Sequence, residues 1–178
     1  LTDAAEMADE AADAHNAHQL FEKLAGKDCV VLAHVGGRYA DIKQAHDGRL
    51  ETSVEVHSAW DTFEWLLRDA FEKNYRVGVV CNSDGHKGRP GADFPGASFF
   101  GATGGLTCYL APRLDRDAIF EALRRRHHYG TTGNRMLLSV EAHLPSSGTL
   151  YLRDPAVFEA PETREVDRVI MGDIAAVR

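Results

Sequence analysis

Short runs of uninterrupted apolar residues recur along the chain, separated by amphipathic segments of helical length. The clearest runs are residues 29–33 and 77–81, and a further strand is expected over 106–111. Continuous apolarity over about four to eight residues is typical of strands that are buried on both faces, as in parallel sheets. The sequence therefore predicts an α/β protein in which parallel strands alternate with helices.

Helix signals lie between these runs. Asp61 and Glu64 have capping-box spacing ahead of apolar residues at helical intervals, which predicts a helix over 61–73. Further helices are expected over 3–25 and 115–126. Additional strands are expected over 53–56 and 136–140, and weaker ones over 149–152 and 169–171.

Composition excludes several classes of protein. A chain of 178 residues corresponds to one domain with little left over. The net charge is −7, and the densest basic run is Arg124 to Arg126, so we expect no nucleic-acid partner. No apolar stretch approaches the length of about 18 residues that a membrane-spanning helix requires, so we expect no membrane partner.

The three cysteines, Cys29, Cys81 and Cys108, cannot all pair, and each lies in or beside a predicted buried strand. They are interpreted as reduced core residues, which favours the cytoplasm, although the compartment stays unknown. The chain shows no signal peptide and opens without Met, so we interpret it as a piece of a longer polypeptide.

Metal-ligating residue types follow three successive predicted strands. His34 follows the first strand, His57 the second, and Asp84 and His86 the third, at intervals of about one βα unit. The carboxyl ends of parallel strands meet at one edge, so these side chains are expected to converge. Imidazole and carboxylate are ligands for Zn, Mn or Fe, and such an ion activates water.

Structural roles compete with this interpretation. A single His at a strand end, such as His34 or His57, is often a capping residue, whereas a carboxylate and an imidazole two residues apart can share an ion. Glu55 is interpreted as a residue that orients a ligand imidazole, with direct ligation and a simple strand-edge charge as the alternatives. His127 and His128 are interpreted as helix-end residues, and His46 and His143 as loop or surface residues without a role.

The segments 31–34, 54–57 and above all 82–86, Asn-Ser-Asp-Gly-His, resemble the C-terminal portion of the polymerase and histidinol phosphatase (PHP) superfamily, in particular a branch of large uncharacterised PHP-like proteins. The similarity covers about residues 27–140. It continues in the segments 87–91, 104–107, 116–123 and 129–133.

The resemblance implies a distorted (βα)7 barrel that holds two or three metal ions and hydrolyses small phosphorylated substrates. His34, His57, Asp84 and His86 match metal ligands of the family. Arg38, Lys87 and Arg89 lie in adjoining loops and are candidates for binding a substrate anion, with solvated loop cations as the alternative. No Ser or Cys nucleophile is needed, because water activated by the metal attacks the ester.

The sequence also departs from the family pattern. It contains no His-x-His motif, which the family carries on its first strand, and a closed barrel needs about 250 residues. We therefore expect a partial barrel over residues 1–144 that lacks its N-terminal strands and holds one ion, followed by a β-rich extension over 145–178. The open edge is expected to pair with a second copy or with the missing segment.

Two other functions remain open at this stage. A related metal site can act on an amide or another substrate without phosphate, as in amidohydrolase-like enzymes. Alternatively, the fold is a non-catalytic binding or structural module that has lost its complete metal site, an idea supported by the missing His-x-His motif.

Overall fold

The computed structural model describes residues 13–35, 40–86 and 104–177. The helices in these residues are α1 (Ala17–Leu24), α2 (Glu64–Glu72) and α3 (Arg116–Arg124). The strands are β1 (Leu32–Ala33), β2 (Ser53–His57), β3 (Gly78–Cys81), β4 (Leu106–Tyr109), β5 (His128–Thr131), β6 (Glu141–Tyr151), β7 (Thr163–Ile170) and β8 (Ile174–Val177).

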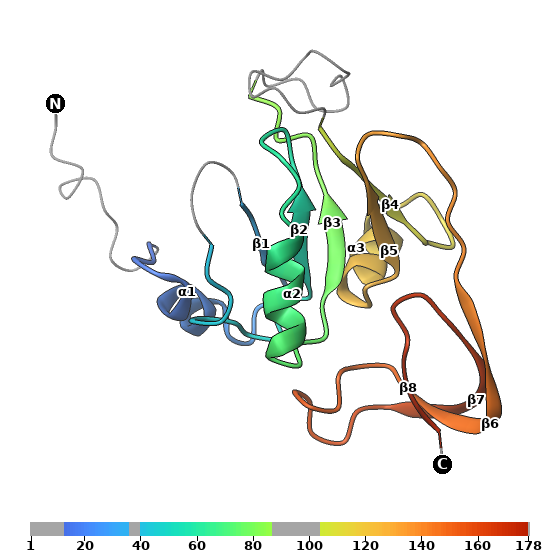
Figure 1. The fold of residues 1–178 in the computed structure, drawn as a ribbon. Coiled ribbons are helices and arrows are strands. Elements are labelled where there is room, and N and C mark those ends of the chain that lie inside the picture. Colours follow the sequence, from blue (N-terminus) through green and yellow to red (C-terminus); the bar gives the residue numbers. More distant parts are fainter. Residues whose placement is uncertain (1–12, 36–39, 87–103, 178) are drawn as a thin grey trace, which may run out of the picture.

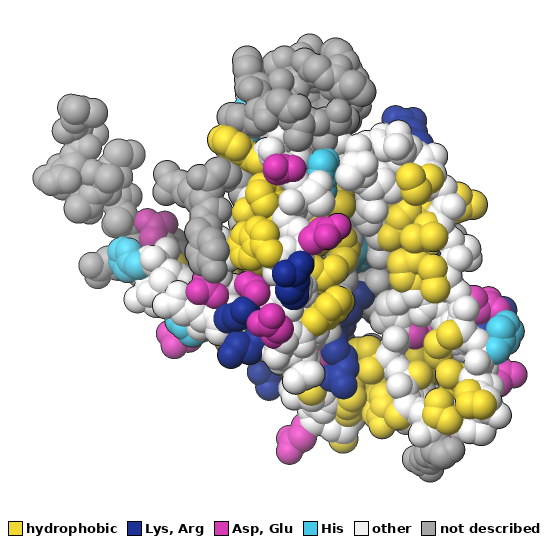
Figure 2. Space-filling model, viewed as in Figure 1, with side chains coloured by type: hydrophobic (Ala, Val, Ile, Leu, Met, Phe, Trp, Pro, Cys, Tyr) yellow, Lys and Arg dark blue, Asp and Glu magenta, His cyan; other side chains and the backbone are white. Residues whose placement is uncertain are grey.

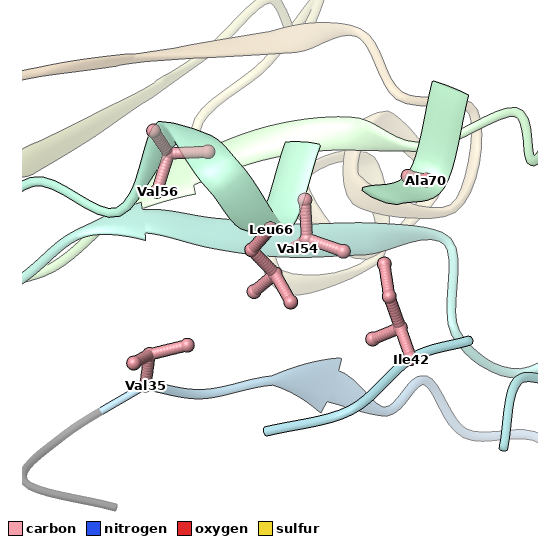
Figure 3. Packing of buried hydrophobic residues seen from close by; sticks show 6 residues of the cluster. All are labelled: Val35, Ile42, Val54, Val56, Leu66 and Ala70. Carbon is pink, nitrogen blue, oxygen red and sulfur yellow. The ribbon is translucent and has the colours of Figure 1, made fainter. Parts of the chain in front are cut away.

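A small parallel sheet of order β1-β2-β3 forms the centre of the fold (Figure 1). Every residue of β2 is buried, because β2 lies between two strands and beneath α2. Leu66 of α2 packs against Val54 of β2, and Val35, Ile42, Val56 and Ala70 complete this hydrophobic core (Figure 3). Burial of such side chains stabilises the fold by about 1.5–3 kcal/mol each.

Of the predicted helix over 3–25, the described residues form a helix only as α1, which begins at Ala17 after the N-cap Asn16, and residues 3–12 lie outside the described part. The other two predicted helices are observed, but one cap differs from the prediction. The expected helix over 61–73 is observed as α2, yet its N-cap is Phe63, whose side chain makes no capping hydrogen bond. Asp61 instead accepts a hydrogen bond from the backbone N–H of Thr62, and its carbonyl oxygen accepts one from Ser58. The predicted helix over 115–126 is confirmed as α3, whose N-cap Asp115 accepts from Ala118 N at 2.8 Å.

A second sheet consists of β4 and β5, which are antiparallel. β5 also packs closely beside β3, and glycine permits this approach. A Cβ atom on Gly130 would lie only 2.1 Å from Cys81 Sγ. Two strands from different sheets therefore come into contact at a position that no larger side chain can occupy.

The third sheet has the order β7-β6-β8 and is antiparallel throughout. It is attached to the rest of the molecule by an ion pair between Arg76 and Asp154, with 2.6 Å between Nη1 and Oδ1. In Figure 1 this sheet lies beyond the amino ends of β2 and β3. The end of the chain thus packs near the edge opposite to the predicted ligands.

The prediction of a partial (βα)7 barrel is wrong. The described strands form three separate sheets, and two of these are antiparallel. Residues 106–111 were expected to form a parallel strand buried on both faces, but Leu106 is 39% exposed and β4 pairs with antiparallel β5. A continuous apolar run indicates that a strand is buried, but it does not indicate whether its neighbours are parallel or antiparallel.

The prediction of a strand over 136–140 is also wrong. The structure has no regular element there, and Met136 and Leu137 are exposed. The strand that follows α3 is β5, which begins at His128. The strand was not predicted because its sequence, His-Tyr-Gly-Thr, is not an apolar run.

The face in Figure 2 carries acidic and basic side chains close together in its lower half, with several separate groups of exposed hydrophobic residues. No helix in the described part of the chain has the length and apolar character needed to cross a bilayer.

Candidate metal centre at the carboxyl edge of the parallel sheet

The parallel sheet brings the ends of β1, β2 and β3 to one edge (Figure 1). His34 follows β1 directly, and Asp84 follows β3 after a two-residue interval. Glu55 and His57 belong to β2, where the pairing with β3 shifts register between them. Backbone pairing alone thus places four of the predicted site residues near this edge.

His34 and Glu55 are hydrogen-bonded partners at this edge. His34 Nδ1 is hydrogen-bonded to Glu55 Oε2, and the Glu55 side chain is only 4% exposed. Glu55 Oε1 accepts a second hydrogen bond from Asn82 Nδ2 at 2.7 Å. Because Nδ1 donates its proton to a carboxylate, Nε2 is the His34 nitrogen that carries the free lone pair.

Asp84 faces that nitrogen. Its Oδ2 atom lies 3.9 Å from His34 Nε2, is shielded from solvent, and has no hydrogen-bond donor among the described residues. A buried carboxylate oxygen without a donor is unfavourable by about 1–3 kcal/mol or more. Zinc lies about 2.0–2.2 Å from nitrogen and oxygen ligands, so two ligands of one ion stand at most about 4.2 Å apart. The two atoms fit a shared cation.

His86 adjoins Asp84 on the more exposed side of the edge. Its Nδ1 donates to the Asp84 carbonyl oxygen at 2.7 Å and lies 3.8 Å from Asp84 Oδ1. The side chain is half exposed. The turn Asn-Ser-Asp-Gly-His therefore folds back on itself, and Asp84 adopts a left-handed backbone conformation there with φ of 48°.

His57 is placed differently from the other three predicted ligands. It is buried, and its Nδ1 lies 2.7 Å from Thr62 Oγ1, in the connection that leads to α2. Within residues 13–35, 40–86 and 104–177, no group of three or more His, Cys, Asp or Glu side chains is arranged to hold a metal ion. The structure thus supplies two facing donors, His34 Nε2 and Asp84 Oδ2, rather than a completed four-ligand set.

The three predicted anion-binding cations, Arg38, Lys87 and Arg89, lie outside the described residues.

Two residues of the site were missed by sequence reasoning. Asn82 holds Glu55, and Thr107 of β4 fixes the start of the Asp84 turn because its Oγ1 donates to Cys81 O at 2.8 Å and accepts from Cys81 N at 3.0 Å. Asn82 belongs to the motif already singled out, so its position was a usable signal. Thr107 was not predictable, because its partner lies 26 residues away.

Cys81 lies at the end of β3, next to the site, and burial raises the pKa of its thiol to about 11. A thiol with a raised pKa is largely protonated at neutral pH and is therefore a weak nucleophile.

A family model described as "Protein of unknown function (DUF3604)" matches residues 97–144. This segment contains β4, α3 and β5, and lies outside the His34–Glu55–Asp84 cluster. No curated protein and no solved structure is detectably similar to the chain.

Proposed function

We propose that the chain carries part of the metal site of a PHP-type hydrolase that acts on small phosphorylated substrates. The observation that supports this proposal is the arrangement of His34 between two carboxylates, with Glu55 on Nδ1 and Asp84 facing Nε2. A carboxylate that accepts the second ring N–H of a metal-binding His is a recurrent feature of metal sites.

Each residue has a separate task in this proposal. Glu55 orients the His34 ring and makes Nε2 more basic, and Asn82 holds Glu55 in place. Asp84 contributes the anionic oxygen, and His86 lies beside it as a further imidazole. When bound, a divalent ion such as Zn, Mn or Fe lowers the pKa of water and polarises a phosphoryl oxygen.

Metal binding tests the proposal directly. Purified chain dialysed against Zn²⁺ or Mn²⁺ is expected to retain about one equivalent, measured by inductively coupled plasma mass spectrometry. Asp84→Asn is expected to lose the ion, since its neutral amide is a far weaker ligand. Glu55→Gln is expected to weaken binding about 10–100-fold, because His34 loses the carboxylate that orients its ring and makes Nε2 more basic.

A matched control is His143→Gln, which removes a histidine that is 77% exposed and pairs with Glu141, away from the site. It is expected to bind metal like the unaltered chain. Retention of the full equivalent by Asp84→Asn would overturn the ligand assignment. Retention of far less than one equivalent by the unaltered chain would instead favour the non-catalytic module. Hydrolysis of a phosphate monoester, compared with that of an amide, separates the two enzymatic alternatives.

A further inference from the structure

A cavity of about 560 Å³ lies at the other end of the parallel strands. Its lining comes from four segments, over 25–29, 47–52, 121–126 and 152–158. Cavities of about 300–1,000 Å³ commonly bind small organic molecules. The first two segments precede β1 and β2, and the third precedes β5, so the cavity opens at the amino edge of these strands.

This cavity is separate from the candidate metal centre. β2 begins at Ser53, next to the cavity, and ends at His57, near the Asp84 edge. Five residues of extended chain span about 15 Å. A ligand in the cavity therefore does not reach the His34–Asp84 pair.

The charge of the lining favours an anion. Six basic residues line the cavity against four acidic ones. The basic residues are Lys27, Arg49, Arg124, Arg125, Arg126 and Arg153. Two of the basic residues are already paired, Arg124 with Asp28 and Arg125 with Asp173, and Asp154 pairs with Arg76 from outside the lining. Lys27, Arg49, Arg126 and Arg153 then remain against Asp47 and Glu121, so basic residues are still in excess.

Of the six basic residues of the lining, Arg126 is the one that is buried. The residue is only 8% exposed, and its Nε donates to the Arg76 carbonyl oxygen at 2.5 Å. The structure gives no acceptor for its two Nη atoms among the described residues. The nearby carboxylate is Asp154, which already pairs with Arg76, so one buried carboxylate faces two guanidinium groups. Arg126 is thus a largely buried cation that shares one carboxylate with Arg76, and a bound anion would supply a further counter-ion.

The cavity also has an apolar, planar wall. The Arg153 guanidinium lies over the Phe158 ring, 5.1 Å from its centroid, and Leu50 and Leu152 lie alongside in the lining. An arginine stacked on an aromatic ring offers a flat surface to a second planar group. The ligand that fits this lining has a planar apolar part and a compact anionic part.

We propose that the cavity binds a phosphomonoester attached to a planar ring, of the nucleoside monophosphate class. The phosphate lies against Arg126, since a guanidinium matches phosphate oxygens with two parallel hydrogen bonds. The ring lies against Arg153 and Phe158. Neither a metal ion nor Asp84 takes part in this binding.

Isothermal titration calorimetry in EDTA tests the proposal with three probes: AMP, inorganic phosphate and adenosine. AMP is expected to bind more tightly than either of its parts, because only AMP engages both walls. Asp84→Asn is expected to bind AMP unchanged, which separates this site from the candidate metal centre. Loss of AMP binding in Asp84→Asn with retention in Arg126→Met would overturn the proposal.

Arg126→Met is expected to weaken AMP binding at least tenfold, since a charged hydrogen-bonding partner is lost. Because Arg126 is buried, Arg153→Met provides a second variant at an exposed residue, and it is expected to weaken AMP more than inorganic phosphate. The matched control is Arg168→Met, an exposed arginine of β7 that pairs with Glu141 and does not line the cavity. Equal AMP affinity in Arg153→Met and Arg168→Met would also overturn the proposal, as would no binding of AMP to the unaltered chain.

Discussion

Ser53 Oγ and His128 Nε2 lie 2.9 Å apart, and both residues are buried. The other ring nitrogen of His128 donates to Val79 O at 3.0 Å, so Nε2 is the acceptor for the serine hydroxyl. This contact joins β2 to β5. In the neutral ring Nε2 accepts the serine hydroxyl proton, whereas in a protonated ring it could only donate to Ser53 Oγ.

The stability of the fold is therefore expected to depend on the protonation of His128. Burial lowers the pKa of His128 below its ordinary value of 6.5, with Arg126 and His127 acting in the same direction. As pH falls below 6.5, the unfolded chain takes up a proton that the folded chain does not, so the free energy of unfolding decreases until the lowered pKa is reached.

Urea unfolding between pH 5 and pH 7.5 measures this effect. His128→Gln is expected to be less stable at pH 7.5 but to lose stability less steeply as pH falls. An equally steep decline in the variant would show that other groups cause the pH dependence.

Asp84→Asn is expected to raise the stability of the metal-free chain by about 1 kcal/mol, because it removes a buried negative charge whose Oδ2 lacks a donor. Asparagine also tolerates the left-handed backbone of residue 84. Added Zn²⁺ is expected to raise the melting temperature of the unaltered chain and leave that of the variant unchanged. Thermal unfolding with and without Zn²⁺ measures both effects. A metal-free variant less stable than the unaltered chain would contradict this account of Asp84.

Gly130→Ala is expected to destabilise the fold by about 1–3 kcal/mol, because its new Cβ would lie 2.1 Å from Cys81 Sγ. The same substitution in a Cys81→Ala background is expected to be less unfavourable, since the sulfur atom is gone. Chemical unfolding of the four proteins of this cycle gives the coupling between the two positions. Simple additivity would show that β3 and β5 are not in close contact here.

His46→Ala is expected to lower the free energy of unfolding by about 2–3 kcal/mol. His46 Nδ1 lies 2.5 Å from the buried Glu51 Oε2, and its ring stacks on Tyr75 with 3.9 Å between centroids. Its removal leaves the Glu51 carboxylate buried without that partner. His143→Ala, at an exposed position, is expected to change stability by less than about 0.5 kcal/mol.

Periodic and capping signals predicted the helices because they depend on local chemistry. The spacing around Leu66 located α2, and Asp115 located the start of α3. Strand direction was not predictable, because the mostly apolar composition of residues 106–111 suits both a parallel and an antiparallel neighbour of β4. The wrong prediction of a partial barrel follows from this ambiguity in strand direction.

The candidate site was likewise predictable only in part. The strand ends that carry His34 and Asp84 were accessible from the pattern of apolar runs, and the structure brings these residues within 3.9 Å. His57 contacts Thr62 at the point where β2 shifts register with β3, and the sequence pattern does not reveal this local irregularity. His46 was interpreted as a loop or surface residue, but its side chain is buried between Glu51, five residues away, and Tyr75, a partner that the local sequence does not reveal.

The pair between Arg76 and Asp154 ties the final sheet to the chain just ahead of β3. One wall of the basic cavity, including Arg153 and Phe158, is thus supplied by residues beyond β6, whereas His34, Glu55 and Asp84 all precede β4. A chain truncated after residue 144 would keep the His34–Glu55–Asp84 cluster but lose the part of the cavity lining that Arg153 and Phe158 supply. The His34–Glu55–Asp84 cluster and the cavity wall of Arg153 and Phe158 are therefore built from different parts of the chain.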